Sequence, residues 1–284
     1  MIISVASGKG GTGKTTVATN LAVSADGPVQ LLDCDVEEPN AHLFLQPVIE
    51  ETRTVATPVP EIDADRCNQC KKCMDICRFR AITVIGDTVL TFPELCHSCG
   101  GCTAICPEGA IHETGRELGV LEVGAADGVA FAHGRLRVGE AMAPPLIRSV
   151  RELARPNGLI LIDAPPGTSC PVIAAMKDTD FVVLVTEPTP FGLHDLKLAV
   201  EAVKILGIPM GLIINRCDMG DDQVRAYARQ ENLPILMEIP FDRQIAESYS
   251  RGEMFTLAIP RWKTRFRELH KQIEALAGKG GAKK

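Results

Sequence analysis

A glycine-rich loop near the start of the chain constrains the fold more than any other feature. It lies between an apolar, β-branched run over residues 1–6 and a helix-like stretch over residues 15–25. Strand, glycine-rich loop and helix in this order are typical of a phosphate-binding loop, in which backbone N–H groups converge on an anion. The residues that we expect to contact a bound nucleotide here are Gly8, Lys9, Gly10, Gly11, Thr12, Gly13, Lys14, Thr15 and Thr16.

Three side chains of this loop carry a charge or a metal-binding oxygen. We expect Lys14 to contact the β- and γ-phosphates of the nucleotide, and the hydroxyl of Thr15 to bind Mg²⁺. Lys9 is unusual, because a single phosphate site is complete without a second lysine at the front of the loop.

Apolar strands and amphipathic helices alternate along the rest of the chain. This pattern predicts an α/β fold with a parallel sheet covered by helices on both faces. The expected strands are residues 29–33, 159–163, 181–185, 211–214 and 235–239, and the expected helices are 146–154, 172–177, 193–206 and 222–231.

Aspartates follow two of these strands. Asp33 and Asp163 end a strand each, and Asp35 comes two residues after the first of them. Carboxylates at the C-terminal edge of a parallel sheet face the ligand crevice. A single aspartate could simply cap a strand, but three of them beside a phosphate loop favour a catalytic site. We expect Asp163 to hold Mg²⁺ through water and Asp35 to orient the attacking water.

Eight of the eleven cysteines form two runs between residues 67 and 106. Both runs have the spacing C-x₂-C-x₂-C-x₃-C, which is typical of bacterial ferredoxins with two 4Fe-4S clusters, and in that spacing the fourth cysteine of each run binds the other cluster. The predicted ligands are Cys67, Cys70, Cys73 and Cys106 for cluster 1, and Cys96, Cys99, Cys102 and Cys77 for cluster 2.

Two other uses of these cysteines are weaker. Zinc sites use C-x₂-C pairs separated by a longer spacer, and a disulfide framework conflicts with the compartment that we expect. The ferredoxin resemblance covers residues 61 to 115 with one departure, since Arg78 stands where the first run usually has proline. His97, between two ligands, is expected to be a hydrogen-bonding neighbour.

The cysteine segment falls between two strands of one expected sheet, so it is expected to be an insertion. The predicted division is residues 1–60 and 116–284 for a nucleotide-binding domain and 61–115 for the inserted domain. Pro47, Pro58 and Pro60 suggest a leading linker, and residues 115–119 a trailing one. Such insertions are tolerated where the two ends lie close together.

Charge and hydropathy bear on location and partners. The net charge of -6 argues against a general nucleic-acid binder. No apolar run is long enough to span a membrane, and Met1 leads directly into the first strand, which leaves no room for a signal peptide. We therefore expect a cytoplasmic protein that does not bind nucleic acid.

These motifs together resemble the MinD/ParA/Mrp group of P-loop ATPases, which includes the nitrogenase iron protein and belongs to the SIMIBI class. Lys9 matches the second lysine of the deviant Walker A loop of that group. Residues 33–35 match the Asp-x-Asp that follows its second strand, and residues 163–167 match its switch II segment. The specific subgroup that the chain resembles has an inserted two-cluster ferredoxin domain of α+β type.

The resemblance implies several further roles. Lys9 reaches the nucleotide of a partner in a homodimer, or in a heterodimer with a related ATPase, that forms on ATP binding. Asn215 contacts adenine, and Pro240 and Asp242 belong to the loop that closes over the base. Mrp-type carriers have a C-x-x-C pair near the C-terminus that this chain lacks after Cys106, so a cluster shared between subunits is not expected.

The last helix is amphipathic. Trp262, Phe266, Leu269, Ile273 and Leu276 share one face, and basic residues occupy the other positions. MinD uses a comparable helix as a membrane anchor, but we expect this one to pack on the sheet. Residues 278–284 are expected to be a disordered tail.

The preferred function is that of an ATPase in which ATP, Mg²⁺ and dimer closure control electron transfer through two 4Fe-4S clusters to an unknown partner. The first alternative is a maturation factor that delivers a cluster or metal to an apoprotein. The second alternative is a positioning ATPase of the MinD/ParA kind whose clusters sense redox state.

Overall fold

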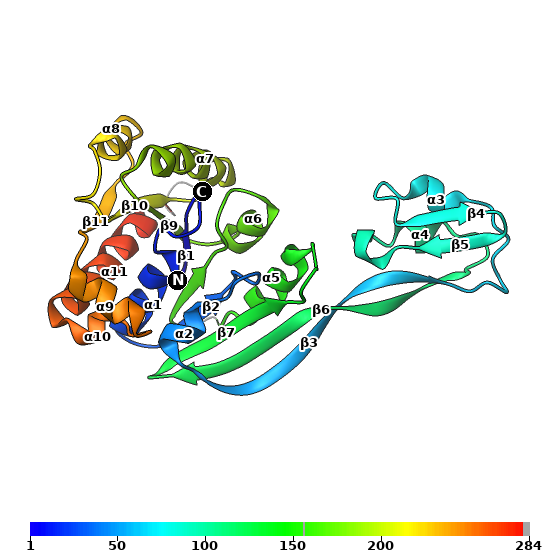
Figure 1. Cartoon of the computed structure of the whole chain (residues 1–284), viewed down its shortest axis with the longest axis horizontal. Helices are drawn as coiled ribbons and strands as arrows, with labels where there is room; N and C mark the ends of the chain where they lie inside the picture. Colours follow the sequence, from blue (N-terminus) through cyan, green and yellow to red (C-terminus); the bar gives the residue numbers. More distant parts are fainter. Residues whose placement is uncertain (156, 281–284) are drawn as a thin grey trace.

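The computed structural model describes residues 1–155 and 157–280. Its main element is a nine-stranded sheet, and a separate two-stranded sheet lies at the far end of the molecule (Figure 1). The strands are β1 (Ile2–Ala6), β2 (Val29–Asp33), β3 (Val48–Ile62), β4 (Ile82–Ile85), β5 (Thr88–Thr91), β6 (Ile111–Ala126), β7 (Val129–Leu136), β8 (Leu159–Asp163), β9 (Phe181–Thr186), β10 (Met210–Asn215) and β11 (Ile235–Ile239).

The helices connect these strands and cover the sheet. They are α1 (Lys14–Ser24), α2 (Ala41–Leu45), α3 (Lys72–Ile76), α4 (Gly101–Ile105), α5 (Ala143–Arg151), α6 (Cys170–Met176), α7 (Pro190–Leu206), α8 (Gln223–Gln230), α9 (Arg243–Ser250), α10 (Phe255–Ala258) and α11 (Pro260–Gly280), with a short 3₁₀ turn over Pro93–Leu95.

Seven neighbouring strands form the parallel part of the sheet, in the order β11-β10-β9-β1-β8-β2-β7. Their side chains are buried on both faces, as continuous apolar strands require. Helices α1, α10 and α11 cover one face and α5, α6, α7 and α8 cover the other. The prediction of an α/β fold with a mostly parallel, doubly covered sheet is confirmed.

The two remaining strands correct the prediction of an entirely parallel sheet. Strand β6 pairs antiparallel with β7 on one side and with β3 on the other. The segments expected to be linkers, residues 47–60 and 115–119, lie almost entirely in β3 and β6. Pro58 and Pro60 are tolerated because β3 is the edge strand of the sheet, where a missing N–H breaks no inner ladder.

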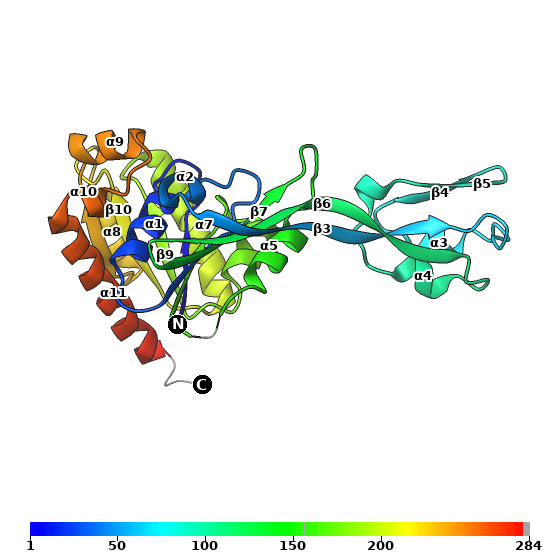
Figure 2. The same ribbon diagram turned by 90° about the horizontal axis from the view of Figure 1, so that it is seen from below.

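Strands β3 and β6 continue beyond the rest of the sheet as a two-stranded arm. Strand β7 accompanies β6 only as far as Gly119, whereas the β3–β6 pairing continues to Ile62 and Ile111. The register of β3 shifts between Val55 and Ala56, where the support of β7 ends. Such irregularities bend a strand and increase its twist, and Figures 1 and 2 show the twisted arm carrying residues 63–110 away from the main body.

The C-terminal helix packs as expected. Trp262, Phe266, Leu269 and Ile273 of α11 are buried in the core beneath the sheet, against α1 and α10. None of the described helices combines the length and apolar content that crossing a bilayer requires. The expected disordered tail lies partly outside the described residues, since residues 278–280 belong to α11 and 281–284 are not described.

Candidate functional site

The glycine-rich loop joins the buried strand β1 to helix α1, as the sequence indicated. Helix α1 begins at Lys14, and its free N-terminal N–H groups give this end of the helix a partial positive charge. Gly13 precedes it in the left-handed region, with φ 97°, and a Cβ atom there would lie 2.6 Å from Nδ2 of Asn215. A side chain at this position is therefore excluded both by the backbone conformation and by the close approach of Asn215.

A pocket of about 1340 Å³, open to solvent, lies in front of this helix end. It brings together residues that the sequence placed in one nucleotide site but that lie far apart in the chain. The predicted residues that line it are Gly10, Gly11, Gly13, Lys14, Thr15, Thr16, Asp35, Asn215, Pro240 and Asp242. Gly8, Lys9 and Thr12 belong to the same loop but are not among the residues that line the pocket.

Two buried carboxylates lie behind the pocket on neighbouring strands. Asp33 of β2 and Asp163 of β8 are paired in the parallel ladder, and both are completely buried. Asp163 Oδ2 accepts a hydrogen bond from the hydroxyl of Thr15 at 2.6 Å, whereas its Oδ1 has no partner among the described residues. Asp33 accepts hydrogen bonds from the N–H groups of Asn40 and Ala41, and so anchors the start of α2.

The electrostatics of these carboxylates indicate a shortage of positive charge. Burial raises the pKa of Asp163 to about 7, although the hydroxyl of Thr15 and the charge of Lys14 oppose the shift. Burial also raises the pKa of Asp35 to about 6, again against Lys14. The pKa of Asp33 is raised by burial and by the neighbouring Asp163. A cation placed beside the unpartnered oxygen of Asp163 would relieve all three shifts.

The segment after β10 and the loop after β11 form the opposite wall of the pocket. Asn215 donates from Nδ2 to the carbonyl of Thr12 at 2.9 Å, which ties the end of β10 to the glycine-rich loop. Asp242 caps α9 through the N–H of Gln244 and pairs with Arg261 at 2.8 Å. Asn215, Pro240 and Asp242 thus line the pocket. Their contacts with a nucleotide base stay a prediction.

Several residues that line the pocket were not predicted from the sequence. An aromatic group from three separate segments lies beside the pocket, with the rings of Phe44 and Tyr249 5.1 Å apart and Phe255 nearby. Phe44 belongs to α2, whose short, weakly patterned sequence carried no signal. Glu38 and Asn40 of the preceding segment also reach the pocket, and only their position after Asp35 could have suggested it.

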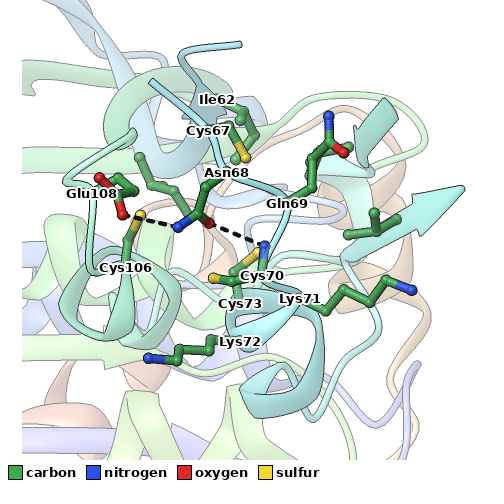
Figure 3. Close-up of a pocket in the computed structure, with 13 residues that line it drawn as sticks. Ile62, Cys67, Asn68, Gln69, Cys70, Lys71, Lys72, Cys73, Cys106 and Glu108 are labelled. Atoms are coloured by element: carbon green, nitrogen blue, oxygen red, sulfur yellow. Dashed lines mark hydrogen bonds between the residues drawn. The ribbon is translucent and has the colours of Figure 1, made fainter. Parts of the chain in front are cut away.

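The eight cysteines divide between two pockets in the unit at the end of the arm. The first pocket, of about 380 Å³ including its open mouth, is lined by Cys67, Cys70, Cys73 and Cys106. Figure 3 shows these four residues around the pocket with Asn68 between them. Asn68 donates from Nδ2 to Glu108 at 2.8 Å and accepts from the N–H of Cys70 at 3.1 Å, so it joins the two cysteine runs.

The second pocket, of about 480 Å³, is lined by the other four cysteines, Cys77, Cys96, Cys99 and Cys102. Pro58 and Pro60 of β3 and Glu113 of β6 also line it, so this pocket lies against the arm. Ile62 and Ile111, at the end of the arm, line the first pocket. The second pocket is therefore nearer to the nucleotide site along the arm.

The surroundings of the thiols suit sulfur ligands that carry negative charge. The N–H groups of Ala81, Ser98 and Ala110 donate to Sγ of Cys77, Cys96 and Cys106 at 3.3–3.4 Å. His97 lies face to face with Phe79, with ring centroids 3.6 Å apart, beside the second pocket. Among the described residues, no three Cys, His, Asp or Glu side chains are close enough together to hold one metal ion. The four cysteines of each set instead line a pocket.

A glycine loop at a helix start, a hydroxyl bonded to a strand-end aspartate, and a parallel sheet behind them define a P-loop nucleotide-binding protein. Residues 3–255 match the CbiA family, described as the CobQ/CobB/MinD/ParA nucleotide binding domain. The chain belongs to this family of P-loop ATPases.

Individual relatives agree with this assignment. An uncharacterised protein of Methanocaldococcus jannaschii is 29% identical over 288 residues, covering 98% of this chain and 96% of that protein. The septum site-determining protein MinD of Pyrococcus horikoshii, solved with Mg-ADP, has the same fold with a TM-score of 0.60 and 23% identity, covering 98% of both chains. An iron-sulfur cluster carrier protein of Aquifex aeolicus is 29% identical over 116 residues, which is 36% of this chain and 32% of the carrier.

Proposed function

We propose that this protein is an ATP-hydrolysing dimer switch that controls electron transfer through two 4Fe-4S clusters held at the end of its arm. The observation that carries the proposal is the arm itself. Strands β3 and β6 belong at one end to the sheet of the nucleotide site, and at the other end they line both cysteine pockets. The continuous backbone of β3 and β6 would therefore transmit a movement of the sheet edge to the two cysteine pockets.

The nucleotide site has suitable groups for ATP and Mg²⁺. Lys14 and the N–H groups at the start of α1 would hold the phosphates, and Thr15 would bind Mg²⁺ together with water-mediated contact from Asp163. The unpartnered Oδ1 of Asp163 fits this assignment. Asp35, with a pKa of about 6, is ionised at neutral pH and would accept a hydrogen bond from the attacking water.

The cysteine pockets fit two 4Fe-4S clusters better than single zinc ions. A tetrahedral zinc ion needs four sulfurs at about 2.3 Å from one point, whereas among the described residues no three metal-binding side chains, cysteines included, lie close enough together to hold one ion. The sets also correspond to the crossed ligation that the spacing predicts. When bound, such clusters supply one-electron transfer. Residues 61–115 would form the inserted electron-transfer domain between residues 1–60 and 116–284.

Lys9 supports the dimer part of the proposal. It lies in the glycine-rich loop but is not among the residues that line the pocket of its own chain. In that pocket Lys14 already supplies a positive charge for the phosphates. Its ammonium is thus free to reach the nucleotide of a second copy, as its place in this family suggests. ATP binding would close the dimer, and hydrolysis would reopen it.

Anaerobic purification, iron analysis and spectroscopy test the clusters, with about eight irons expected per chain. The reduction potentials are then measured with and without a non-hydrolysable ATP analogue. We expect a change in potential, or in the rate of electron transfer to an acceptor dye, that is lost in Lys14→Ala. If the analogue changes neither quantity in the intact protein, the gating proposal is wrong.

A second function, delivery of a cluster to an apoprotein, is favoured by the partial similarity to an iron-sulfur cluster carrier protein. A delivery site would release its iron readily. A chelator challenge of the purified protein therefore separates the two functions, because clusters used for electron transfer should survive it and a delivered cluster should not.

A further inference from the structure

A row of ionisable side chains crosses the sheet from the nucleotide site to the arm. Asp163 of β8 is paired with Asp33 of β2, Asp33 with His133 of β7, and His133 with Glu122 of β6. Directly paired residues of neighbouring strands project from the same face of a sheet. Asp163, Asp33 and His133 are almost completely buried, and Glu122 belongs to the strand that continues into the arm.

Helix α2 contacts both this row and the nucleotide pocket. Asn40 and Phe44 line the nucleotide pocket, and Asp33 anchors the first N–H groups of the helix. The ring of His42, in the same helix, meets the ring of His133 edge-on, with centroids 5.1 Å apart and an angle of 63° between the planes. A nucleotide that displaced Asn40 or Phe44 would therefore also move His42 relative to His133.

The two histidines are incompletely hydrogen-bonded in this arrangement. His133 Nε2 is 2.7 Å from a carboxylate oxygen of Glu122, but among the described residues neither His133 Nδ1 nor His42 Nδ1 has a partner, although both atoms are buried. Burial lowers the pKa of His133, against the opposing effect of Glu122, and so favours a neutral ring. A neutral ring that donates from Nε2–H to Glu122 keeps Nδ1 as an acceptor.

Buried polar atoms without partners are costly, and a small rearrangement that pairs them gives a two-state element. We propose that, when nucleotide closes the pocket, His42 Nδ1–H donates a hydrogen bond to His133 Nδ1, and that this bond transmits the movement of α2 through Glu122 to strand β6. His42 and His133 are thus positioning residues that couple the nucleotide site to the arm. The inference rests on the proposed nucleotide switch, but not on electron transfer.

The test uses the full-length protein, with ¹⁵N-labelled histidine for NMR and with backbone hydrogen exchange followed by mass spectrometry. A non-hydrolysable ATP analogue with Mg²⁺ is the probe. In the wild-type protein we expect the His133 Nδ1 resonance to shift on addition of the analogue, and exchange in residues 111–126 to change together with exchange in residues 34–45. The analogue should shift no nitrogen of His112, which serves as the internal reference.

Two substitutions of His42 separate the bond from a general effect on packing. His42→Phe keeps a ring but has no donor, so the response in residues 111–126 and the shift of His133 should be lost while that in 34–45 remains. His42→Asn can place an amide N–H near the position of Nδ1 and should restore the response of the arm. The matched control is His112→Asn, which removes an exposed histidine–glutamate pair from the same strand and should leave every response intact.

The outcomes are separable from those of the proposed function. An arm that responds to nucleotide in His42→Phe as in the wild type, or that does not respond in the wild type, overturns this inference. If the NMR and hydrogen-exchange responses of the wild type and the variants are as expected but the nucleotide does not change the reduction potentials, the inference holds and the proposed electron-transfer gate is wrong.

Discussion

Cys77 and Cys96 line the same pocket, although one ends the first cysteine run and the other begins the second. Their proximity follows from the way the two halves of the unit pack, with α3 against α4. The corresponding exchange places Cys106 in the pocket of Cys67, Cys70 and Cys73.

Paired cysteine substitutions test this crossed arrangement. Cys77→Ser with Cys96→Ser removes two ligands from one pocket, so we expect about four irons per chain to remain. Cys77→Ser with Cys67→Ser removes one ligand from each pocket and should impair both clusters. Iron analysis and EPR of the reduced proteins measure the difference. If each run held its own cluster, the two double variants would give the opposite results.

Mixing of two inactive variants tests the role of Lys9 across a dimer. Lys9→Ala and Asp35→Asn should each hydrolyse ATP at least about 100-fold more slowly than the wild type, because each removes charge or positioning at the reaction centre. A mixed dimer contains one complete site. The mixture should therefore recover up to about a quarter of the wild-type rate, since half of the dimers are mixed. No recovery in a mixture shown by mass spectrometry to contain mixed dimers would place Lys9 at its own nucleotide.

The pKa of Asp163 predicts how stability depends on pH without nucleotide. The folded pKa of about 7 exceeds the unfolded value of about 3.9, so between these values the folded state binds more protons. Its stability therefore falls as pH rises through this window, by up to about 1.4 kcal/mol per pH unit.

Urea denaturation at several pH values measures this slope, and Asp163→Asn should make it shallower while abolishing Mg²⁺-dependent hydrolysis. The raised pKa values of Asp33 and Asp35 contribute to the slope that remains. An unchanged slope in Asp163→Asn would show that this carboxyl titrates normally in the folded protein.

A buried ion pair fastens the base of the arm to the main body. Arg116 of β6 bonds to Glu140 of the β7–α5 loop, and the side chain of Glu140 is only 1% exposed. Arg116→Met leaves this carboxylate without its main partner and should cost about 3 kcal/mol of unfolding free energy. Arg116→Met with Glu140→Gln should recover part of the loss. Arg53→Gln, which breaks an exposed pair on β3, is the control and should not change the denaturation midpoint.

The elements that the sequence predicted well have strong local signals. The glycine-rich loop contains the glycines that its turn requires. Short apolar runs that contain β-branched residues, such as that of β8, indicate buried strands. The pattern of α11 indicated the buried face that the structure contains, because Trp262 and Phe266 recur at helical spacing.

The arm could not be predicted in the same way. Strand β3 is rich in polar residues and contains Pro58 and Pro60, features that locally suggest a linker. Only its place at the edge of the sheet, paired to β6, makes it a strand. The contact of His42 with His133 depends on the register between strands and on a five-residue helix, and neither is encoded in any local pattern.

The register shift between Val55 and Ala56 has a mechanical consequence. It coincides with Gly119, where β7 ends its support and where a Cβ atom would lie 2.3 Å from the carbonyl oxygen of Arg135. Beyond this point and the Arg116–Glu140 pair, the free ribbon of β6, residues 111–115, is roughly 17 Å long. A tilt of about 10° at its base would displace its tip by about 3 Å. The arm therefore amplifies small angular changes, and a substitution at Gly119 should alter the resting position of both cysteine pockets at once.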